Sequence, residues 1–564
     1  MNDIRLVLTV CMLIISTPLI QAQSLPVGTV ALEDFYRRSQ LNGLGDSSVS
    51  HTIRPLFSGS STTIGNLYFP DSTSQTDLLK VGYTRWITED GKFKASILPL
   101  NFQLRFNSHN PYGWNDGAMI PAKGIQNLIS GGLLAEYGIL SVQLNPEILL
   151  AANPSFEGFT KEHYDVIAAR YYDFYNFTDL PQRFGTQPYS KASWGQSSIR
   201  LNYKVVSFGL SNENLWWGPG IRSSLLMSNS APGFKHLTLN SIRPLKTSIG
   251  SFEGQLVAGR LEGSGFDPSI PGRSYLGDSL YLPKSDDWRY LSGLAISWQP
   301  KWVPGLHFGL TRSFQSYSKD VGKGLGDYLP VFFRFQNLKR DDVISKTDQY
   351  GSLYLRWVWP EEKAEIYFEY GRNSRSGNMR DKILEPEDNR AYIFGLRKFL
   401  PFGRRAEEQI LVGLEVTQLQ QAAAKTVLDA RSWYVNKYIR HGYTHRGEAL
   451  GAGIGPGGGL QSLDVSWIKG VKRIGLQFER YVHNNDFYYY AYIDSQDWRR
   501  HWGDISMAMS SEWDYKNLLF NARFQYIKSI NYQWYLLQTD PNQYFTNGLD
   551  KSNVQVQLGF SYRF

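Results

Sequence analysis

The sequence predicts an all-β protein, an 18-stranded antiparallel transmembrane β-barrel with a small N-terminal helical element in the periplasm. Segments of about ten residues in which apolar and polar side chains alternate recur along the chain, as in membrane barrels. The connections between these segments alternate between short turns and long loops. The chain is also rich in aromatic residues, with 31 Phe, 35 Tyr and 16 Trp, although its mean hydropathy is only −0.35.

Residues 1–22 have the pattern of a secretory signal peptide. A continuous apolar run, Leu6 to Ile20, follows a short polar start, and cleavage is expected before Gln23. The run is shorter than the roughly 20 residues that a membrane helix needs. Cys11, the only cysteine, lies in this leader, so the mature chain offers no thiol for disulfides, Cys-ligated zinc or a cysteine nucleophile. An exported chain without a later apolar helix is either soluble outside the cytoplasm or a barrel.

Residues 23–93 are expected to form an N-terminal periplasmic element, and residues 94–564 the outer-membrane barrel. Ala31 to Gly43 has helical spacing of its apolar residues, and Gly43 and Gly45 are suitable helix stops. We expect this helix to pack against the mouth of the barrel.

The C-terminal segment favours a barrel over a soluble protein. Val554 to Phe564 alternates apolar with polar residues and stops on an aromatic residue. A terminal Phe564 resembles the signal by which the barrel assembly machinery recognises its clients, so that machinery is an expected partner, with outer-membrane lipid and lipopolysaccharide.

The connections set the predicted strand count. Short turns are expected near Gly138, Lys204, Ser248, Trp302, Glu362, Phe402, Gly470 and Tyr515. Nine long loops separate these hairpins, which gives 18 strands. A count of 16 stays open, because Ser198 to Tyr203 and Leu237 to Thr247 alternate only weakly. The short turns are flanked by six tryptophans that fit a periplasmic aromatic girdle, namely Trp298, Trp302, Trp357, Trp359, Trp467 and Trp513.

Several blocks resemble the Wzi family of capsule assembly proteins. The most specific is Asn212 to Gly220 (NENLWWGPG), followed by Ser228 to Phe234 (SNSAPGF). Further blocks are Ser50 to Pro55, Leu140 to Glu147, Phe252 to Leu261, Glu369 to Asn373 and Gly442 to Pro456. The resemblance implies an 18-stranded outer-membrane barrel with a small helical periplasmic element. It also implies a surface lectin that binds capsular polysaccharide, rather than an enzyme or an exporter.

Motifs for catalysis and cofactors are weak. Gly453 to Gly458 fits a glycine-rich pattern formally, but Pro456 and the missing helix remove the phosphate cradle. His441 and His445 have metal-like spacing only on a helix, and Gly442 between them favours a loop. We therefore expect no metal, no cofactor, no nucleic acid and no catalytic residue, although a hydrolase site assembled across strands stays open.

Sugar rings stack on aromatic side chains, and their hydroxyl groups need amides and charged groups. Three segments interleave such residues, namely Tyr171 to Phe177, Asn484 to Trp498 and Asn531 to Tyr544. Our candidate polysaccharide-binding residues are Glu213, Trp216, Trp217, Arg222, Arg440 and Arg446. A purely structural role for the Trp pair, as a wedge that holds a loop in the lumen, stays open. The alternative function is a diffusion channel for saccharides or other small solutes, because a barrel of this size can enclose an aqueous lumen.

Overall fold

The computed structural model describes residues 23–58, 66–70, 85–333, 346–373, 380, 383, 386–387, 389–405, 407–421, 432–492, 497–538, 540, 542–543 and 546–564. The predicted signal peptide, residues 1–22, lies outside the described residues.

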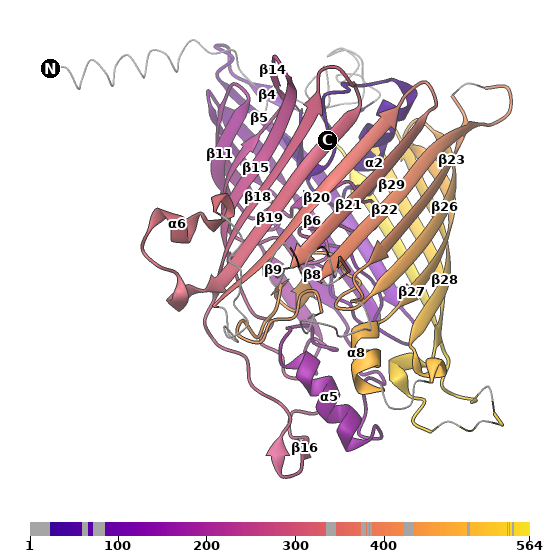
Figure 1. Ribbon diagram of the computed structural model, residues 1–564. Helices are drawn as coiled ribbons and strands as arrows, with labels where there is room; N and C mark the ends of the chain where they lie inside the picture. Colours follow the sequence, from indigo (N-terminus) through magenta and orange to yellow (C-terminus); the bar gives the residue numbers. More distant parts are fainter. Residues whose placement is uncertain are drawn as a thin grey trace.

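The wall is a closed antiparallel β-barrel of 18 strands, which confirms the predicted fold (Figure 1). The last strand pairs with the first, from Gln555 opposite Asn107 to Tyr562 opposite Leu100. The two weak segments are strands as well, so the count of 16 is wrong. In chain order the wall consists of β5 (Phe93–Asn107), β6 (Gly124–Tyr137), β7 (Leu140–Leu144) with β8 (Glu147–Ala151), β9 (Tyr189–Ser193) with β10 (Ser198–Tyr203), β11 (Val206–Ser211), β13 (His236–Ser241) with β14 (Leu245–Thr247), β15 (Gly250–Leu261), β18 (Arg289–Pro300), β19 (Leu306–Tyr317), β20 (Thr347–Trp359), β21 (Ala364–Asn373), β22 (Arg390–Pro401), β23 (Gln409–Gln418), β26 (Gly459–Lys469), β27 (Lys472–Val482), β28 (Gly503–Tyr515), β29 (Leu518–Ile530) and β30 (Lys551–Tyr562).

All the predicted short turns join consecutive wall strands at one end of the barrel. Each of them contains a residue at positive φ, for example Gly138 at 60°, Lys204 at 55° and Gly470 at 58°. The long loops gather at the other end, where Figure 1 shows helices α5 (Asp165–Tyr175) and α8 (Asn485–Ala491) below the wall. The other elements of these loops are β16 (Ser274–Tyr275), β17 (Asp278–Ser279), η2 (Ser318–Asp320), α6 (Leu325–Tyr328), η3 (Pro330–Phe332), η4 (Trp498–Arg500) and η5 (Tyr532–Trp534).

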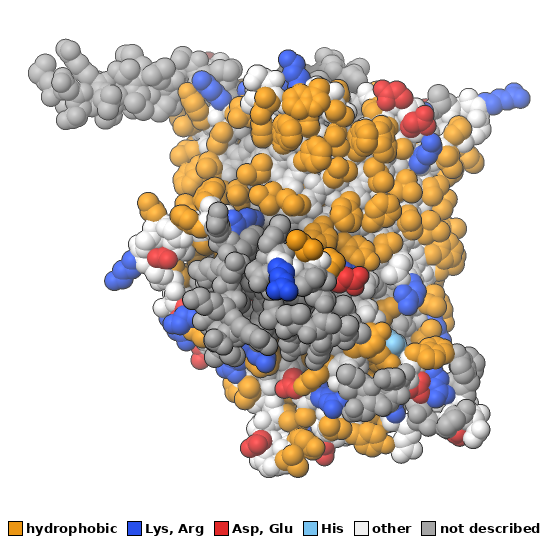
Figure 2. All heavy atoms as spheres, in the orientation of Figure 1, with side chains coloured by type: hydrophobic (Ala, Val, Ile, Leu, Met, Phe, Trp, Pro, Cys, Tyr) orange, Lys and Arg blue, Asp and Glu red, His pale blue; other side chains and the backbone are white. Residues whose placement is uncertain are grey.

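The outside of the wall is apolar. On β29, Phe520, Phe524 and Tyr526 are exposed, whereas the alternate residues Gln525 and Ile527 are buried in the lumen. Figure 2 shows hydrophobic side chains spread over much of the visible wall, above all in its upper part. The six predicted girdle tryptophans lie beside the short turns and pack in pairs, with the rings of Trp357 and Trp359 4.4 Å apart. No helix in the described part of the chain is long and apolar enough to cross a membrane.

The N-terminal element enters the barrel at the short-turn end. Its helix, α2 (Val30–Ser39), continues as η1 (Gln40–Asn42) and stops at Gly43, whose φ is 68°, as the sequence predicts. Leu32 packs in an apolar cluster with wall residues such as Leu134 and Leu519. The short strands beside it are β1 (Ser24–Leu25), β2 (Ile53–Arg54), β3 (Leu56–Phe57) and β4 (Arg85–Ile87).

Charged side chains fix α2 against the wall. Arg37 donates to both carboxylate oxygens of Glu365 on β21, at 3.1 and 3.2 Å, and Asp34 accepts from Arg397 on β22 at 2.5 Å. Arg356 also donates to Glu365, at 2.7 Å. Burial alone would raise the pKa of Asp34, but Arg397, Arg38 and Arg473 hold it well below its usual value. The domain boundary at residue 93 stays a prediction.

Two long loops fold into the lumen, and we call residues 214–234 and 432–458 the lumenal plug. They contain β12 (Trp216–Trp217), β24 (Thr444–His445) and β25 (Glu448–Ala449). Trp217, Trp433 and Tyr434 are fully buried there and form one apolar core with inward residues of the wall such as Val257 and Leu291. The plug therefore fills the outer part of the lumen.

One loop instead folds back over the outside of the wall. Arg312 on β19 points outward, and its guanidinium donates to the carbonyls of Val331 (2.7 Å) and Phe333 (2.6 Å). Val331 packs against Leu294 and Phe314 on the outer face of β18 and β19. We call residues 318–333 the outer cover; it hides a charge that the wall would otherwise expose.

Candidate functional site

The three aromatic segments that the sequence singles out converge at the long-loop end. Helices α5 and α8 pack side by side, and Trp534 of η5 joins them in a single cluster of buried side chains. The ring of Phe487 lies 5.7 Å from Tyr171 and 4.7 Å from Trp534. The first segment lies more than 300 residues before the other two in the sequence, so their convergence is a property of the barrel.

Most rings of this cluster hold the loops together. Phe487 is fully buried, and Tyr172, Tyr488 and Trp534 are less than 5% exposed. The sequence missed other members, such as Phe159, whose ring stacks 4.0 Å from Tyr171. Such buried rings build a rigid support rather than a contact surface.

Three rings of the same layer face outward, and we call them the outer aromatic surface: Tyr489 and Tyr490 are 37% and 38% exposed, and Trp498 is 62% exposed. His501 contacts two of these residues, since its ring lies 5.8 Å from Tyr489 and its Nδ1 lies 2.8 Å from the Trp498 carbonyl. Burial lowers the pKa of His501, so the imidazole is neutral at neutral pH.

Polar groups border these rings. Tyr490 donates its hydroxyl to the exposed carboxylate of Asp173 at 2.6 Å. Arg170 of α5 lies 5.8 Å from the Tyr490 ring and donates to the carbonyl of Ala491 at 2.7 Å. The surface thus combines apolar ring faces with a carboxylate and a guanidinium, which is the chemistry that a sugar needs.

Trp216 and Trp217, which the sequence analysis treats as a pair, lie in the lumen and face different surroundings. They form β12, which pairs with β2 of the N-terminal element, Trp216 opposite Arg54. The Arg54 guanidinium lies 4.9 Å from the Trp216 ring. Trp217 is fully buried, and its Nε1 donates to Gln255 of β15 at 2.8 Å.

Glu213 and Arg222 are not neighbours either. Glu213 is fully buried and accepts from Arg200 (2.5 Å), Ser211 (2.8 Å) and the hydroxyl of Ser24. Its carboxylate is thus occupied by the protein. Arg222 pairs with Glu479 at 2.8 Å, and only Arg222 and Trp216 of the predicted set line a cavity of about 390 Å³ in the lumen.

Arg440 and Arg446 lie in the second loop of the plug, away from Trp216. Arg446 pairs with Glu262 at 2.8 Å. Partial burial alone would raise the pKa of the Glu262 carboxyl, but Arg446 and Arg260 hold that pKa below its ordinary value. The backbone N–H of Arg440 donates to the Tyr317 hydroxyl at 3.1 Å. The structure therefore distributes the six predicted residues over several places, and their roles in ligand binding stay predictions.

Metal binding has no visible basis in the described ranges. The His, Cys, Asp and Glu side chains described there form no group of three or more that could hold a metal ion. His441 and His445 lie in the plug, where burial lowers the pKa of both imidazoles.

The chain matches the family model of the capsule assembly protein Wzi over residues 189–531. Among solved structures it is similar to Wzi from Escherichia coli, described as a carbohydrate-binding β-barrel involved in group 1 capsule assembly. The two are 13% identical with a TM-score of 0.58, over 96% of this chain and 100% of that chain. OccD3 from Pseudomonas aeruginosa is 10% identical with a TM-score of 0.39, over 83% and 91% of the two chains. No curated protein sequence matches the chain.

Proposed function

This chain belongs to the family of Wzi capsule assembly proteins, and from that premise we propose that it binds capsular polysaccharide at the cell surface and helps to attach or assemble the capsule there. The outer aromatic surface carries this proposal. Tyr489, Tyr490 and Trp498 expose ring faces at the end of the barrel where the long loops gather.

The location follows from the fold. A closed barrel with an apolar outer wall leaves no unpaired strand edge, so it is suited to a bilayer, and we place it in the outer membrane. Lipid and lipopolysaccharide then surround the wall. The barrel assembly machinery is a further proposed partner, through the aromatic C-terminus at Phe564, whose ring packs 4.9 Å from Tyr562.

The proposed activity is binding without catalysis. Aromatic faces stack on the C–H faces of sugars, and the rings are held by the buried cluster of α5 and α8, so little conformational entropy is lost on binding. The carboxylate of Asp173 and the guanidinium of Arg170 supply hydrogen bonds to hydroxyl groups beside Tyr490.

Deletion of the gene from an encapsulated strain tests the function. We expect polysaccharide to be released into the medium while its export continues. The full-length protein with Trp498→Ala should then fail to restore retention. Base stacking on aromatics contributes about 1–3 kcal/mol per contact, so one lost stack predicts a roughly five- to 150-fold weaker affinity for purified polysaccharide.

Trp302→Ala is the matched control, because Trp302 is 65% exposed at the short-turn end. It should retain the capsule as the unchanged protein does. Unchanged polysaccharide binding by Trp498→Ala would show that the outer aromatic surface is not the site. A steady open pore in planar bilayers would favour the diffusion channel instead, and release of acyl chains from labelled phospholipid would favour a hydrolase.

A further inference from the structure

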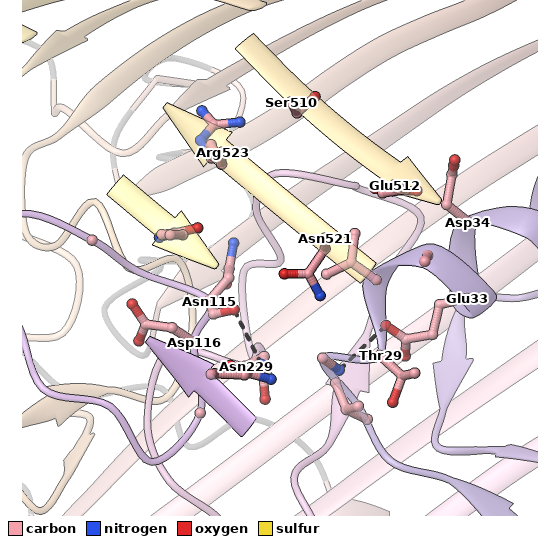
Figure 3. Close-up of a pocket in the computed structure, with 18 of the residues that line it drawn as sticks. Thr29, Glu33, Asp34, Asn115, Asp116, Asn229, Ser510, Glu512, Asn521 and Arg523 are labelled. Carbon is pink, nitrogen blue, oxygen red and sulfur yellow. Dashed lines mark hydrogen bonds between the residues drawn. The ribbon is translucent and has the colours of Figure 1, made fainter. Parts of the chain in front are cut away.

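A second site lies inside the barrel, in the cavity of about 390 Å³ between the N-terminal element and the lumenal plug. Ligand pockets commonly have volumes of about 300–1,000 Å³, so this one is large enough for a small molecule. Figure 3 shows its three sides. Thr29 and Glu33 approach from α2, Asn115 and Asn229 from the loops, and Ser510 and Asn521 from the wall strands β28 and β29.

The wall side of the cavity carries many amides and hydroxyls among its charged and apolar residues. Lumen-facing residues alternate along each strand, and here they carry amides and hydroxyls. Examples are Gln103, Ser462, Gln477, Ser510, Asn521 and Gln557. A wall of this kind offers donors and acceptors to a ligand that is itself rich in hydroxyl groups.

The positive charges around the cavity are already paired. Every arginine among the described lining residues has a carboxylate within ion-pair distance. The pairs include Arg222 with Glu479 and Arg473 with Asp464, each at 2.8 Å, and Arg105 with Asp116. A polyanion would find no unpaired cation in this part of the structure, whereas an uncharged ligand leaves all these pairs intact.

Two buried polar groups on one side of the cavity lack a partner among the described residues. These are Nε1 of Trp216, a donor, and Oε1 of Glu33, an acceptor, in side chains 3% and 6% exposed. Arg54 links the two residues, since it lies 3.6 Å from the other oxygen of Glu33 and 4.9 Å from the Trp216 ring. Such groups are rare in folded proteins, and both belong to residues that line the cavity.

We propose that the lumenal cavity is a second carbohydrate site, which binds one uncharged mono- or disaccharide unit. The amides and hydroxyls of the wall strands bind the hydroxyl groups of the sugar, and Trp216 and Glu33 border the same cavity. The site is enclosed by the barrel and is separate from the outer aromatic surface, so each can exist without the other.

The test is calorimetric titration of the purified full-length protein with glucose, galactose, N-acetylglucosamine, maltose and glucuronate. We expect saturable, millimolar binding of at least one uncharged sugar and weaker binding of glucuronate. Ser510→Trp fills the cavity from β28 and should weaken that binding at least about tenfold. Met509→Trp is the control, because Met509 is its neighbour on the same strand but is 54% exposed on the outer wall.

Heat-modifiable migration checks that each variant has folded, and Asn521→Phe on β29 replaces Ser510→Trp if the latter does not assemble. Absence of saturable binding to every uncharged sugar would overturn the proposal, as would tighter binding of glucuronate or equal losses in Ser510→Trp and Met509→Trp. Capsule retention by cells tests the outer aromatic surface independently of the cavity. Cells with the folded, cavity-filled variant should retain their polysaccharide even though sugar binding in the lumen is lost.

Discussion

Glu365 is the side chain whose loss should release the N-terminal element. It is fully buried on β21 and lies among three guanidinium groups, those of Arg37 (3.1 Å), Arg356 (2.7 Å) and Arg397 (3.3 Å). Glu365→Gln keeps the shape but removes the charge. The arginines then repel one another in a site that water does not reach, with Asp34 as the nearest remaining carboxylate.

The size of the expected effect follows from the burial of the Glu365 ion pairs. Removal of one partner from a buried ion pair costs about 3–5 kcal/mol, because the other charge is left uncompensated. Arg37 is the member of the cluster that belongs to α2, so the cost is relieved when α2 leaves the mouth of the barrel. The opening equilibrium of α2 should therefore increase roughly 150- to 5,000-fold.

Hydrogen exchange of the α2 amides measures this opening in the folded protein. Trypsin gives a second reading, since it cleaves after Arg37 and Arg38 only when α2 has opened. Glu362→Gln is the control. Glu362 pairs with Lys398 at 3.2 Å, but its side chain is 73% exposed, and exposed pairs contribute only about 0–1 kcal/mol.

Equal α2 exchange in Glu365→Gln and Glu362→Gln would refute the reasoning. It would mean that the apolar contacts of Leu32 with the wall hold α2 and that the charges add nothing. Faster exchange throughout the wall strands would also contradict it, because the effect should be confined to the N-terminal element.

Three further outcomes test the plug and the outer loops. Trp217→Ala should lower the free energy of unfolding by about 3–5 kcal/mol, read by thermal unfolding, and should raise the conductance in planar bilayers. Gly293→Ala would place a Cβ 2.6 Å from the Trp217 ring and should also lower the unfolding midpoint, whereas at Gly254 the nearest atom is 3.4 Å away and the same change should be mild. Burial raises the pKa of Asp486 to about 6. This carboxyl accepts from the hydroxyl of Ser432 in the lumenal plug. A carboxyl with a raised folded pKa stabilises the fold as the neutral acid, so hydrogen exchange in plug residues 432–458 should accelerate as pH rises from about 4 to 6. In Asp486→Asn that exchange should show no such rise beyond its intrinsic pH dependence.

The strands and turns of the wall could be predicted from the sequence because each depends on a pattern within a few neighbouring residues. Alternation with a period of two marks a strand, and turns such as that at Lys204, with φ of 55°, are recognisable in a few residues. Even the weak segment Ser198 to Tyr203 obeys this pattern once it is paired on both sides.

The contacts inside the lumen could not be predicted from the sequence, because they join residues far apart in the chain through short and irregular strand pairings. Trp216 pairs with Arg54 over only two residues on each strand. A pairing this short produces no periodic pattern in the sequence that would predict it. Successive residues of a strand also point to opposite sides, so Trp216 and Trp217 cannot form the single platform that their adjacency suggests. The partners of Glu213 could not be predicted for the same reason, since one of them, Ser24, belongs to the N-terminal element.

The outer cover bears on how the barrel enters a bilayer. A bare guanidinium near the middle of the hydrocarbon costs about 2–4 kcal/mol, and less toward the interface. The carbonyls of Val331 and Phe333 lower this cost for Arg312 when they lie over it. The hairpin of β18 and β19 should thus insert late, after the loop that follows β19 has folded down upon it. In a bilayer, the lipid chains beside β18 and β19 would meet Phe332 and Phe333 of the outer cover, which are 59% and 57% exposed, instead of the wall itself.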